Sequence, residues 1–312
     1  MNKCLLFLRA VAAFSSILNA QQSGWPPSAD HLTLPVWPGV APGGVANLAA
    51  EADTTKPKAP QVAGRRLVRL SNVSSPTLTL YTPKTQNSGA AVVVFPGGGY
   101  QVLAMDLEGT EVCDWLNAIG VNCVLLKYRV PHTETDHKSA AAFEDAQRAI
   151  GLVRQHAAEW HIDPNRIGVL GFSAGGHLAA SLSTNFDKRA YDPIDVADKL
   201  SCRPDFAVLI YPAYLALDDK DFAPNPEIKP TENTPPTFIV QTEDDPVHVE
   251  NALVYYQELK TAKVPAELHI YAQGGHGYGL RRTALPVTAW PVSLDTWLHT
   301  INMLPGKGLP AK

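Results

Sequence analysis

The stretch RIGVLGFSAGGHLAASLS, residues 166–183, decides the fold. Its first half is a short apolar run that predicts a buried strand, and its second half is rich in Ala and Leu, as helices are. Between them GFSAG, residues 171–175, matches the pattern G-x-S-x-G, which places a serine on a sharp turn from strand to helix. Ser173 is therefore predicted to be a nucleophile at a helix N-terminus, and the alternative is a plain turn of small residues.

The rest of the chain alternates between strand-like and helical patterns. Helical spacing of apolar residues covers 143–160 and 247–262. Apolar runs that indicate strands buried on both faces occur at 78–82, 91–95, 121–127, 167–171, 206–211, 237–241 and 267–271. This alternation predicts an α/β fold with a mostly parallel central sheet and helices on both faces. In such sheets the active site gathers at the carboxyl ends of the strands.

A serine hydroxyl at its ordinary pKa is a weak nucleophile, so a base and an orienting acid are expected. Among the ten histidines, His276 follows the last predicted strand within GGHGYG, residues 274–279. Glycines around it permit a loop that carries the imidazole to a neighbouring strand end, so His276 is the predicted general base. A simple Gly-rich turn is the alternative. His177 and His269 lie within a helix and a strand, where structural roles are expected.

The acid is expected in TEDDPVHVE, residues 242–250, because it lies between the serine and the histidine. Neighbouring side chains in an extended loop diverge, so only one of Asp244 and Asp245 can meet the imidazole. A metal site built from these acids and His248 is disfavoured, since no H-x-x-x-H or C-x-x-C pattern accompanies them. No metal and no cofactor are therefore expected.

A second Gly-rich loop, PGGGY at residues 96–100, follows an early predicted strand. Its backbone N–H groups, with that of Ala174, can form an oxyanion hole. Pro96 stands where the histidine of an H-G-G-G loop would be, so the loop is expected to be held by the proline ring and not by an imidazole hydrogen bond. A phosphate-binding loop is disfavoured because the G-x-G-x-x-G spacing and the P-loop lysine are absent.

Four motifs together resemble the α/β-hydrolase superfamily: PGGGY, GFSAGGHLAA, DDPVHVEN and GGHGYGLR. Within it the chain is similar to bacterial acetylxylan esterases and related lipase-like or feruloyl-type carbohydrate esterases, over about residues 30–303. The resemblance implies an α/β-hydrolase fold with Ser173 as nucleophile and His276 as base. It also implies that Gly98 or Gly99 binds the oxyanion together with Ala174. Acyl transfer through an acyl-enzyme is the implied reaction.

The resemblance also favours one of the two acids. Related hydrolases often read H-G-x-x-D in this loop, and that frame places Asp245, followed by Pro246, in the catalytic position. Asp244 remains the alternative.

The N-terminus, with Lys3 and Arg9 before a short apolar run, predicts a signal peptide over residues 1–20 and a secreted or periplasmic protein without a membrane partner. The alternative, an anchor helix, is disfavoured because the run is shorter than the roughly 20 residues of a membrane span. A Pro- and Gly-rich arm is predicted at 21–60, the catalytic domain at 61–304 and a tail at 305–312.

Composition limits the partners further. The chain has 312 residues, a formal net charge of -4 and a pI near 6.2, which disfavour nucleic-acid binding. Nothing in it specifies an oligomeric state. Once the signal peptide is removed, Cys113, Cys123 and Cys202 remain, so at most one intrachain disulfide is possible.

The substrate is expected to be a small-molecule or polysaccharide ester. The insertion at 211–236 is polar, Pro-rich and too short for a large lid domain, which favours short acyl groups such as acetyl on xylan. A general short-chain carboxylesterase, a serine peptidase and a silent binding module are the alternatives. The side chains of Tyr100, Glu108, Tyr214 and Tyr278 lie beside the catalytic loops and either line the cleft or serve structural roles.

Overall fold

The computed structural model describes residues 25, 30–43, 48–132 and 139–306. The predicted signal peptide at 1–20 lies outside these residues. No helix in the described segments has the length and apolar character needed to cross a membrane.

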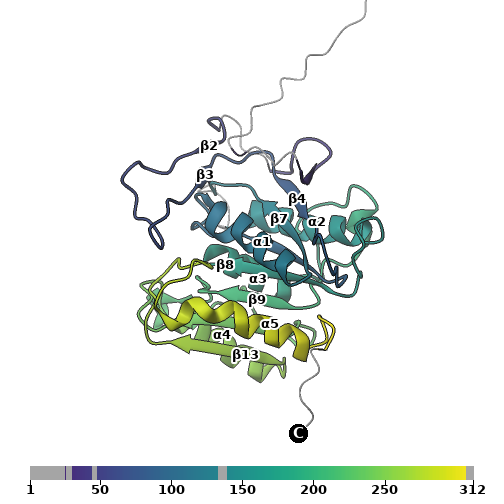
Figure 1. Ribbon diagram of the computed structural model, residues 1–312. Coiled ribbons are helices and arrows are strands. Elements are labelled where there is room, and N and C mark those ends of the chain that lie inside the picture. The colour runs from purple at the N-terminus through teal and green to yellow at the C-terminus, as the bar shows by residue number, and fades with distance from the viewer. Residues whose placement is uncertain (1–24, 26–29, 44–47, 133–138, 307–312) are drawn as a thin grey trace, which may run out of the picture.

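The core of the fold is one large sheet (Figure 1). Its strands, in chain order, are β1 (Leu32–Pro35), β4 (Thr77–Tyr81), β5 (Ala91–Phe95), β7 (Asn122–Lys127), β8 (Ile167–Phe172), β9 (Ala207–Ile210), β12 (Thr237–Thr242) and β13 (Ala266–Tyr271). Their spatial order is β1-β4-β7-β5-β8-β9-β12-β13. The pairs from β7 to β13 are parallel, whereas β1 and β4 join antiparallel at one edge. The seven predicted strands and the mostly parallel sheet are confirmed.

Five α-helices lie in the described part of the chain: α1 (Glu111–Ala118), α2 (Ala140–Gln155), α3 (Ala174–Thr184), α4 (Glu250–Thr261) and α5 (Trp290–Thr300). Helix α2 packs against α3, which in turn covers β8 and β9. Helices α1 and α5 meet through Trp115 and Trp290, whose ring centroids are 6.0 Å apart. In Figure 1, α5 crosses in front of the sheet. The two helices predicted from apolar spacing are α2 and α4.

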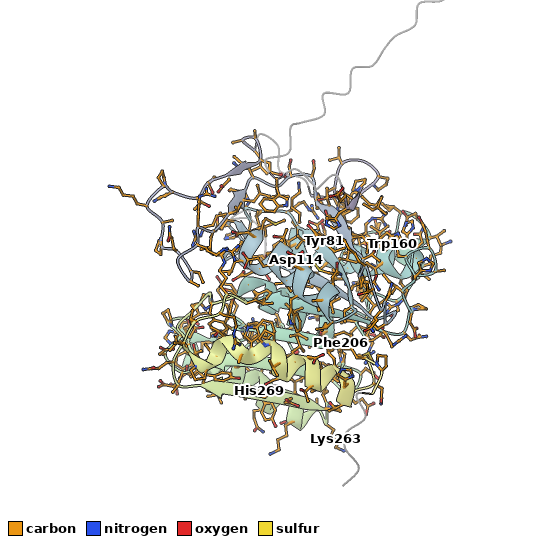
Figure 2. All side chains as sticks on the ribbon, in the orientation of Figure 1. Tyr81, Asp114, Trp160, Phe206, Lys263 and His269 are labelled. Carbon is orange, nitrogen blue, oxygen red and sulfur yellow. A yellow bond between two sulfur atoms is a disulfide. The ribbon has the colours of Figure 1, made fainter. Side chains whose placement is uncertain are left out.

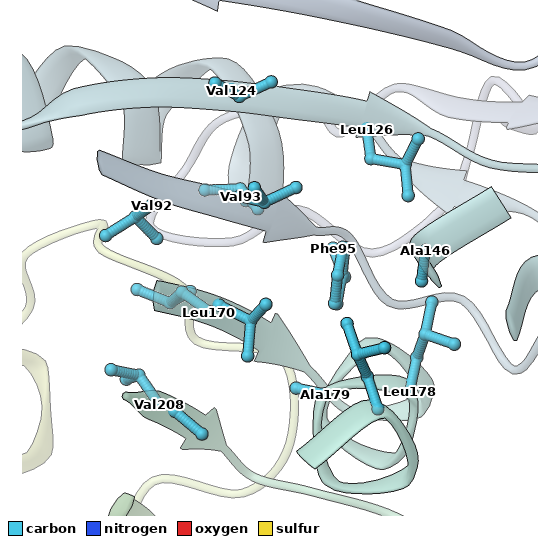
Figure 3. Close-up of a cluster of buried hydrophobic side chains, with 14 of the residues drawn as sticks. Val92, Val93, Phe95, Val124, Leu126, Ala146, Leu170, Leu178, Ala179 and Val208 are labelled. Atoms are coloured by element: carbon cyan, nitrogen blue, oxygen red, sulfur yellow. The ribbon is translucent and has the colours of Figure 1, made fainter. Parts of the chain in front are cut away.

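The central strands are buried on both faces, as their continuous apolar runs predicted. Side chains of the strands meet those of α2 and α3 in one dense cluster (Figure 3), which includes Val92, Val93, Phe95, Val124, Leu126, Ala146, Leu170, Leu178, Ala179 and Val208. Burial of apolar area stabilises the fold by about 25 cal/mol per Å². The edge strand β13 is less buried; His269, labelled in Figure 2, lies on it with Nε2 2.7 Å from Oε1 of Glu267.

The region predicted as an arm, residues 21–60, contributes one strand to the large sheet and one to a separate three-stranded sheet. Residues Leu32–Pro35 form the edge strand β1, and Ala52–Asp53 (β2) pairs with Arg69–Ser71 (β3), which pairs with Leu103–Ala104 (β6). Four residues are too few to show a strand period, so sequence patterning gave no sign of β1. A buried ion pair between Lys127 and Glu51, 2.8 Å long, further fixes this region to the sheet.

A disulfide joins Cys113 of α1 to Cys123 of β7, and Cys202 is a buried free thiol. This is the single intrachain disulfide that the cysteine count permits. It connects the helix and the strand that follow the Gly-rich loop at residues 97–99.

Candidate active site

Ser173 lies at the turn between β8 and α3 with φ 52° and ψ −118°. Positive φ is unfavourable for residues other than glycine, so tight packing must hold this conformation. The flanking glycines explain how: a Cβ on Gly171 would lie 1.9 Å from the carbonyl O of Gly175, and one on Gly175 would lie 2.1 Å from that of Phe95. The G-x-S-x-G spacing is thus required by the close approach of two backbones beneath the serine.

His276 and Asp245 converge on Ser173 from neighbouring strand ends. The Nε2 atom of His276 lies 2.9 Å from Oγ of Ser173, and Nδ1 lies 2.8 Å from Oδ2 of Asp245. The imidazole is partly exposed, whereas the Asp245 side chain is fully buried. Because β8, β12 and β13 run parallel, residues far apart in sequence meet at one edge of the sheet.

The two neighbouring acids hold different parts of the histidine loop. The carboxylate of Asp244 accepts hydrogen bonds from the N–H groups of Gly274 (3.2 Å) and Gly275 (2.8 Å). These backbone donors, that of Gly275 foremost, lower the pKa of Asp244. Asp245 contacts His276 and also accepts a hydrogen bond from the N–H of Val247 at 2.7 Å. The structure therefore brings Asp245, and not Asp244, to the imidazole.

The loop at Gly97–Gly99 presents unused donors to the same edge. The N–H groups of Gly98 and Gly99 have no hydrogen-bond acceptor among the described residues, and Ala174 is the first residue of α3, where N–H groups lack a helical partner. Gly98 has φ +136°, and a Cβ there would lie 2.1 Å from the carbonyl O of Val102. Only glycine fits this turn, and the N–H groups of Gly98, Gly99 and Ala174 stay the predicted oxyanion donors.

A family model described as BD-FAE matches residues 78–204. A solved structure of an acetyl ester-xyloside bifunctional hydrolase from Caldicellulosiruptor lactoaceticus is similar to this chain, with 35% identity and a TM-score of 0.68 over 90% of this chain and 100% of that one. A second, MGS-M1, an α/β-hydrolase enzyme from a deep-sea metagenome library, has 29% identity and a TM-score of 0.59 over 76% of this chain and 97% of its own. The chain belongs to the α/β-hydrolase esterases.

A curated relative extends this placement. The acetylxylan esterase of Xylanibacter ruminicola is 32% identical over 244 residues, which is 70% of this chain and 47% of the relative. The chain thus spans about half the length of that protein. The predicted fold family is confirmed.

In this esterase, Glu108 and Tyr128 hold the Gly-rich loop at residues 96–99, so the expectation that the proline ring holds it is corrected. Oε2 of Glu108 accepts a hydrogen bond from the N–H of Gly97 at 2.7 Å, and the Tyr128 hydroxyl donates to the carbonyl O of Pro96. Glu108 lies on a π-helical turn, Asp106–Thr110, and is only 4% exposed. Of the two roles expected for Glu108, lining the cleft or a structural role, it has the structural one, and no sequence pattern pointed to Tyr128.

The same carboxylate also reaches the histidine loop through Tyr211. The Tyr211 hydroxyl donates to Oε1 of Glu108 at 2.8 Å and accepts from the N–H of Gly279 at 3.2 Å. Its ring meets the imidazole of His276 edge-on, with centroids 4.9 Å apart. Burial raises the pKa of Glu108, against the opposing effects of the hydrogen bonds from Tyr211 and Gly97. One buried carboxylate therefore connects the two loops that flank the serine.

A hollow of about 590 Å³ opens above Ser173, and we call it the serine hollow. Among its lining residues are Tyr100, Ser173, His177, Tyr214, Pro246 and Asn251. The Tyr100 hydroxyl lies 2.7 Å from Nδ1 of His177, which gives this histidine the structural bond expected of it. Tyr100 and Tyr214 line the hollow, whereas Glu108 and Tyr278 are buried beside it. The described residues contain no group of three His, Cys, Asp or Glu side chains that could hold a metal ion.

Proposed function

We propose that this esterase removes short acyl groups, foremost acetyl, from a xylan-type polysaccharide. The observation that carries the proposal is the continuous chain of contacts from Asp245 through His276 to Ser173, at 2.8 and 2.9 Å, beside three free backbone donors. Acyl transfer needs a nucleophile, a base and an oxyanion hole at one point, and this arrangement supports the first two roles directly.

In the proposed mechanism, Ser173 attacks the ester carbonyl carbon while its hydroxyl proton moves to Nε2 of His276. Asp245 accepts the Nδ1–H hydrogen bond, which keeps the imidazole in the tautomer that can take this proton. The N–H groups of Ala174 and of Gly98 or Gly99 donate to the oxyanion. The intermediate then expels the alcohol, which takes the proton from Nε2. Water attacks the acyl-enzyme by the same steps and releases the acid and Ser173.

Three observations support the substrate class. The relative from X. ruminicola is named an acetylxylan esterase, and the similar solved structure is named an acetyl ester-xyloside bifunctional hydrolase. The serine hollow is lined by polar as well as apolar side chains, which suits a sugar better than a long acyl chain. The insertion at 211–236 adds only two short strands, β10 (Ala216–Leu217) and β11 (Ala223–Pro224), and a 3₁₀ turn, so it covers the site with no large lid.

Location outside the cytoplasm is part of the proposal. It rests on the predicted signal peptide at residues 1–20 and on the disulfide between Cys113 and Cys123, which suits an oxidising compartment. We also propose the division into an arm at 21–60, a catalytic domain at 61–304 and a tail at 305–312.

The test is acetate release from acetylated xylan, compared with hydrolysis of 4-nitrophenyl acetate, 4-nitrophenyl decanoate and an aminoacyl anilide. We expect acetate release and hydrolysis of the acetate ester, both lost by roughly 10⁶-fold in Ser173→Ala. Ser183→Ala is the matched control, because its hydroxyl is buried and donates to the carbonyl O of Ala179. Cleavage of the anilide alone would contradict the esterase proposal, and hydrolysis of nitrophenyl esters without acetate release from xylan would contradict the polysaccharide substrate.

A further inference from the structure

A second hollow, of about 630 Å³, continues from the serine hollow along helix α3, and we call it the distal hollow. Its lining includes Phe143, Ser181, Thr184, Asn185 and Lys188. Ser139 and Glu227 line both hollows, so the two are contiguous. The first hollow begins at the N-terminus of α3 and the second reaches its C-terminus.

One face of α3 forms the floor of this combined groove. Ser173, His177, Ser181 and Thr184 follow one another at spacings of four, four and three residues, which places them on the same side of a helix. At about 1.5 Å per residue the 11 residues of α3 extend over roughly 16 Å. The floor is therefore polar and longer than a single ester group requires.

Ser181 provides the observation that points to a ligand. The residue is only 7% exposed and lines the distal hollow, and its hydroxyl has no hydrogen-bond partner in the described segments. The neighbouring Ser183 and Thr184 instead donate to helix carbonyls, at 2.7 and 3.0 Å. The oxygen is accessible from the hollow, so a hydroxyl-bearing ligand bound there can exchange a hydrogen bond with it.

The charged groups around the distal hollow indicate a neutral ligand. Five charged side chains line it. Arg189 donates to the backbone carbonyls of Gln147 and Leu200, and Glu144 pairs with Arg129 at 2.8 Å, while the other three, Asp187, Lys188 and Glu227, bring charges of both signs. The partly buried ring of Phe143 adds an apolar surface to the same hollow. Hydroxyl groups beside an aromatic ring suit the alternating polar edges and apolar faces of a sugar chain.

We propose that the distal hollow binds the unacylated sugar residues that flank the esterified one in a neutral oligosaccharide chain. The proposal rests on the proposed function, because it takes the serine hollow as the place of the ester. Sugar binding in the distal hollow would make this esterase selective for polymeric over small esters, through contacts beyond the reacting ester group.

The experiment compares kcat/KM for monoacetylated xylohexaose with that for monoacetylated xylobiose, as a ratio within each variant. In the wild type we expect a ratio on the order of tenfold, as one or two added hydrogen-bonded contacts supply. Ser181→Leu, which fills the distal hollow, should bring the ratio close to one. Ser183→Ala removes a hydroxyl from the core side of the same helix and should leave the ratio unchanged. A wild-type ratio near one, or an undiminished ratio in Ser181→Leu, would overturn the proposal.

A binding measurement separates this proposal from the proposed function. Calorimetry would measure the affinity of unacetylated xylohexaose for Ser173→Ala protein with and without Ser181→Leu. Binding that Ser181→Leu weakens at least fivefold supports the distal hollow, even if no acetate is released from xylan and the proposed function fails. The opposite outcome is also distinguishable. If the wild type releases acetate but xylohexaose does not bind, or binds equally well with Ser181→Leu, the proposed function stands and the proposed sugar site in the distal hollow is rejected.

Discussion

Two glycine-rich loops flank the serine of this esterase, and a carboxylate holds each of them by accepting backbone hydrogen bonds. Glu108 holds the loop at Gly97, and Asp244 holds the loop at Gly274 and Gly275. The first carboxylate is buried, so desolvation raises its pKa, whereas the second is exposed and its backbone donors lower its pKa. The same kind of contact, a carboxylate that accepts backbone hydrogen bonds, therefore occurs once in a buried and once in an exposed environment.

This difference indicates which of the two carboxylates the geometry of the site depends on more strongly. The exposed carboxylate acts on one loop, and water can replace its hydrogen bonds when it is lost. The buried carboxylate also accepts from Tyr211, which contacts the histidine loop through Gly279, so its loss disturbs both loops at once. A buried polar network of this kind is costly to disrupt because no solvent substitutes for the missing partner.

The largest effect is expected from the two neighbouring acids of the histidine loop. Asp245→Asn should lower kcat by about 10⁴-fold, because an amide does not hold the imidazole in the required tautomer. Asp244→Asn should lower it by less than about tenfold, since the side chain contacts only the loop backbone. Steady-state kinetics on 4-nitrophenyl acetate would measure both, with circular dichroism to verify folding. Equal losses in the two variants would contradict the separate roles.

The second prediction exchanges a glycine in each loop for alanine. In Gly98→Ala the new Cβ would lie 2.1 Å from the carbonyl O of Val102, so the backbone must move and kcat should fall by about 10²-fold or more. In Gly275→Ala no atom lies within 4 Å of the new Cβ, and only the positive φ of 60° is unfavourable. That strain costs about 1–2 kcal/mol of stability with little change in kcat. Steady-state kinetics and thermal melts of both variants would measure these effects. A lower activity of Gly275→Ala than of Gly98→Ala would contradict the prediction.

The third prediction concerns the carboxylate that joins the loops. Glu108→Gln preserves the shape of the side chain and one acceptor atom, so we expect kcat to fall on the order of tenfold while KM stays nearly constant. Tyr211→Phe removes the hydroxyl that connects Glu108 to the N–H of Gly279 and should give a similar loss. The double variant should lose little more than either single one, because both act through one network. Fully multiplicative losses would show that the two residues act independently.

The smallest effect is a pair of opposite pH dependences of stability. The raised pKa of Glu108 means that its contribution is present below its ordinary pKa of 4.5 and is lost as the pH rises through the folded-state value. The lowered pKa of Asp244 means that its contribution is present above its ordinary pKa of 3.8 and is lost as the pH falls through the folded-state value. Urea unfolding should be measured across the acidic and neutral pH range. The free energy of unfolding of Glu108→Gln should rise relative to that of the wild type as the pH rises. Asp244→Asn should differ from the wild type least at the acidic end, and the reverse trend in either variant would contradict its assignment.

Much of the fold was predictable because the deciding features are local. Strand runs such as 91–95 and 167–171 carry their apolar pattern within five residues, and the structure places strands there. The short edge strand Leu32–Pro35 was missed, because its place depends on pairing with residues 77–80, far along the chain. A strand of four residues is too short to show a regular alternation of apolar and polar side chains.

The site divides in the same way. The sequence by itself determined the turn at Ser173, since glycine spacing controls backbone approach. It also named His276, and the resemblance favoured Asp245 over Asp244; their catalytic roles stay predictions. Only the tertiary structure showed that Asp245 reaches the imidazole while Asp244 holds the loop, and that Glu108 and Tyr128 hold the Gly-rich loop at residues 96–99. The reason is physical: backbone conformation depends on neighbouring residues, whereas the partner of a buried side chain depends on which strand ends the sheet order brings together.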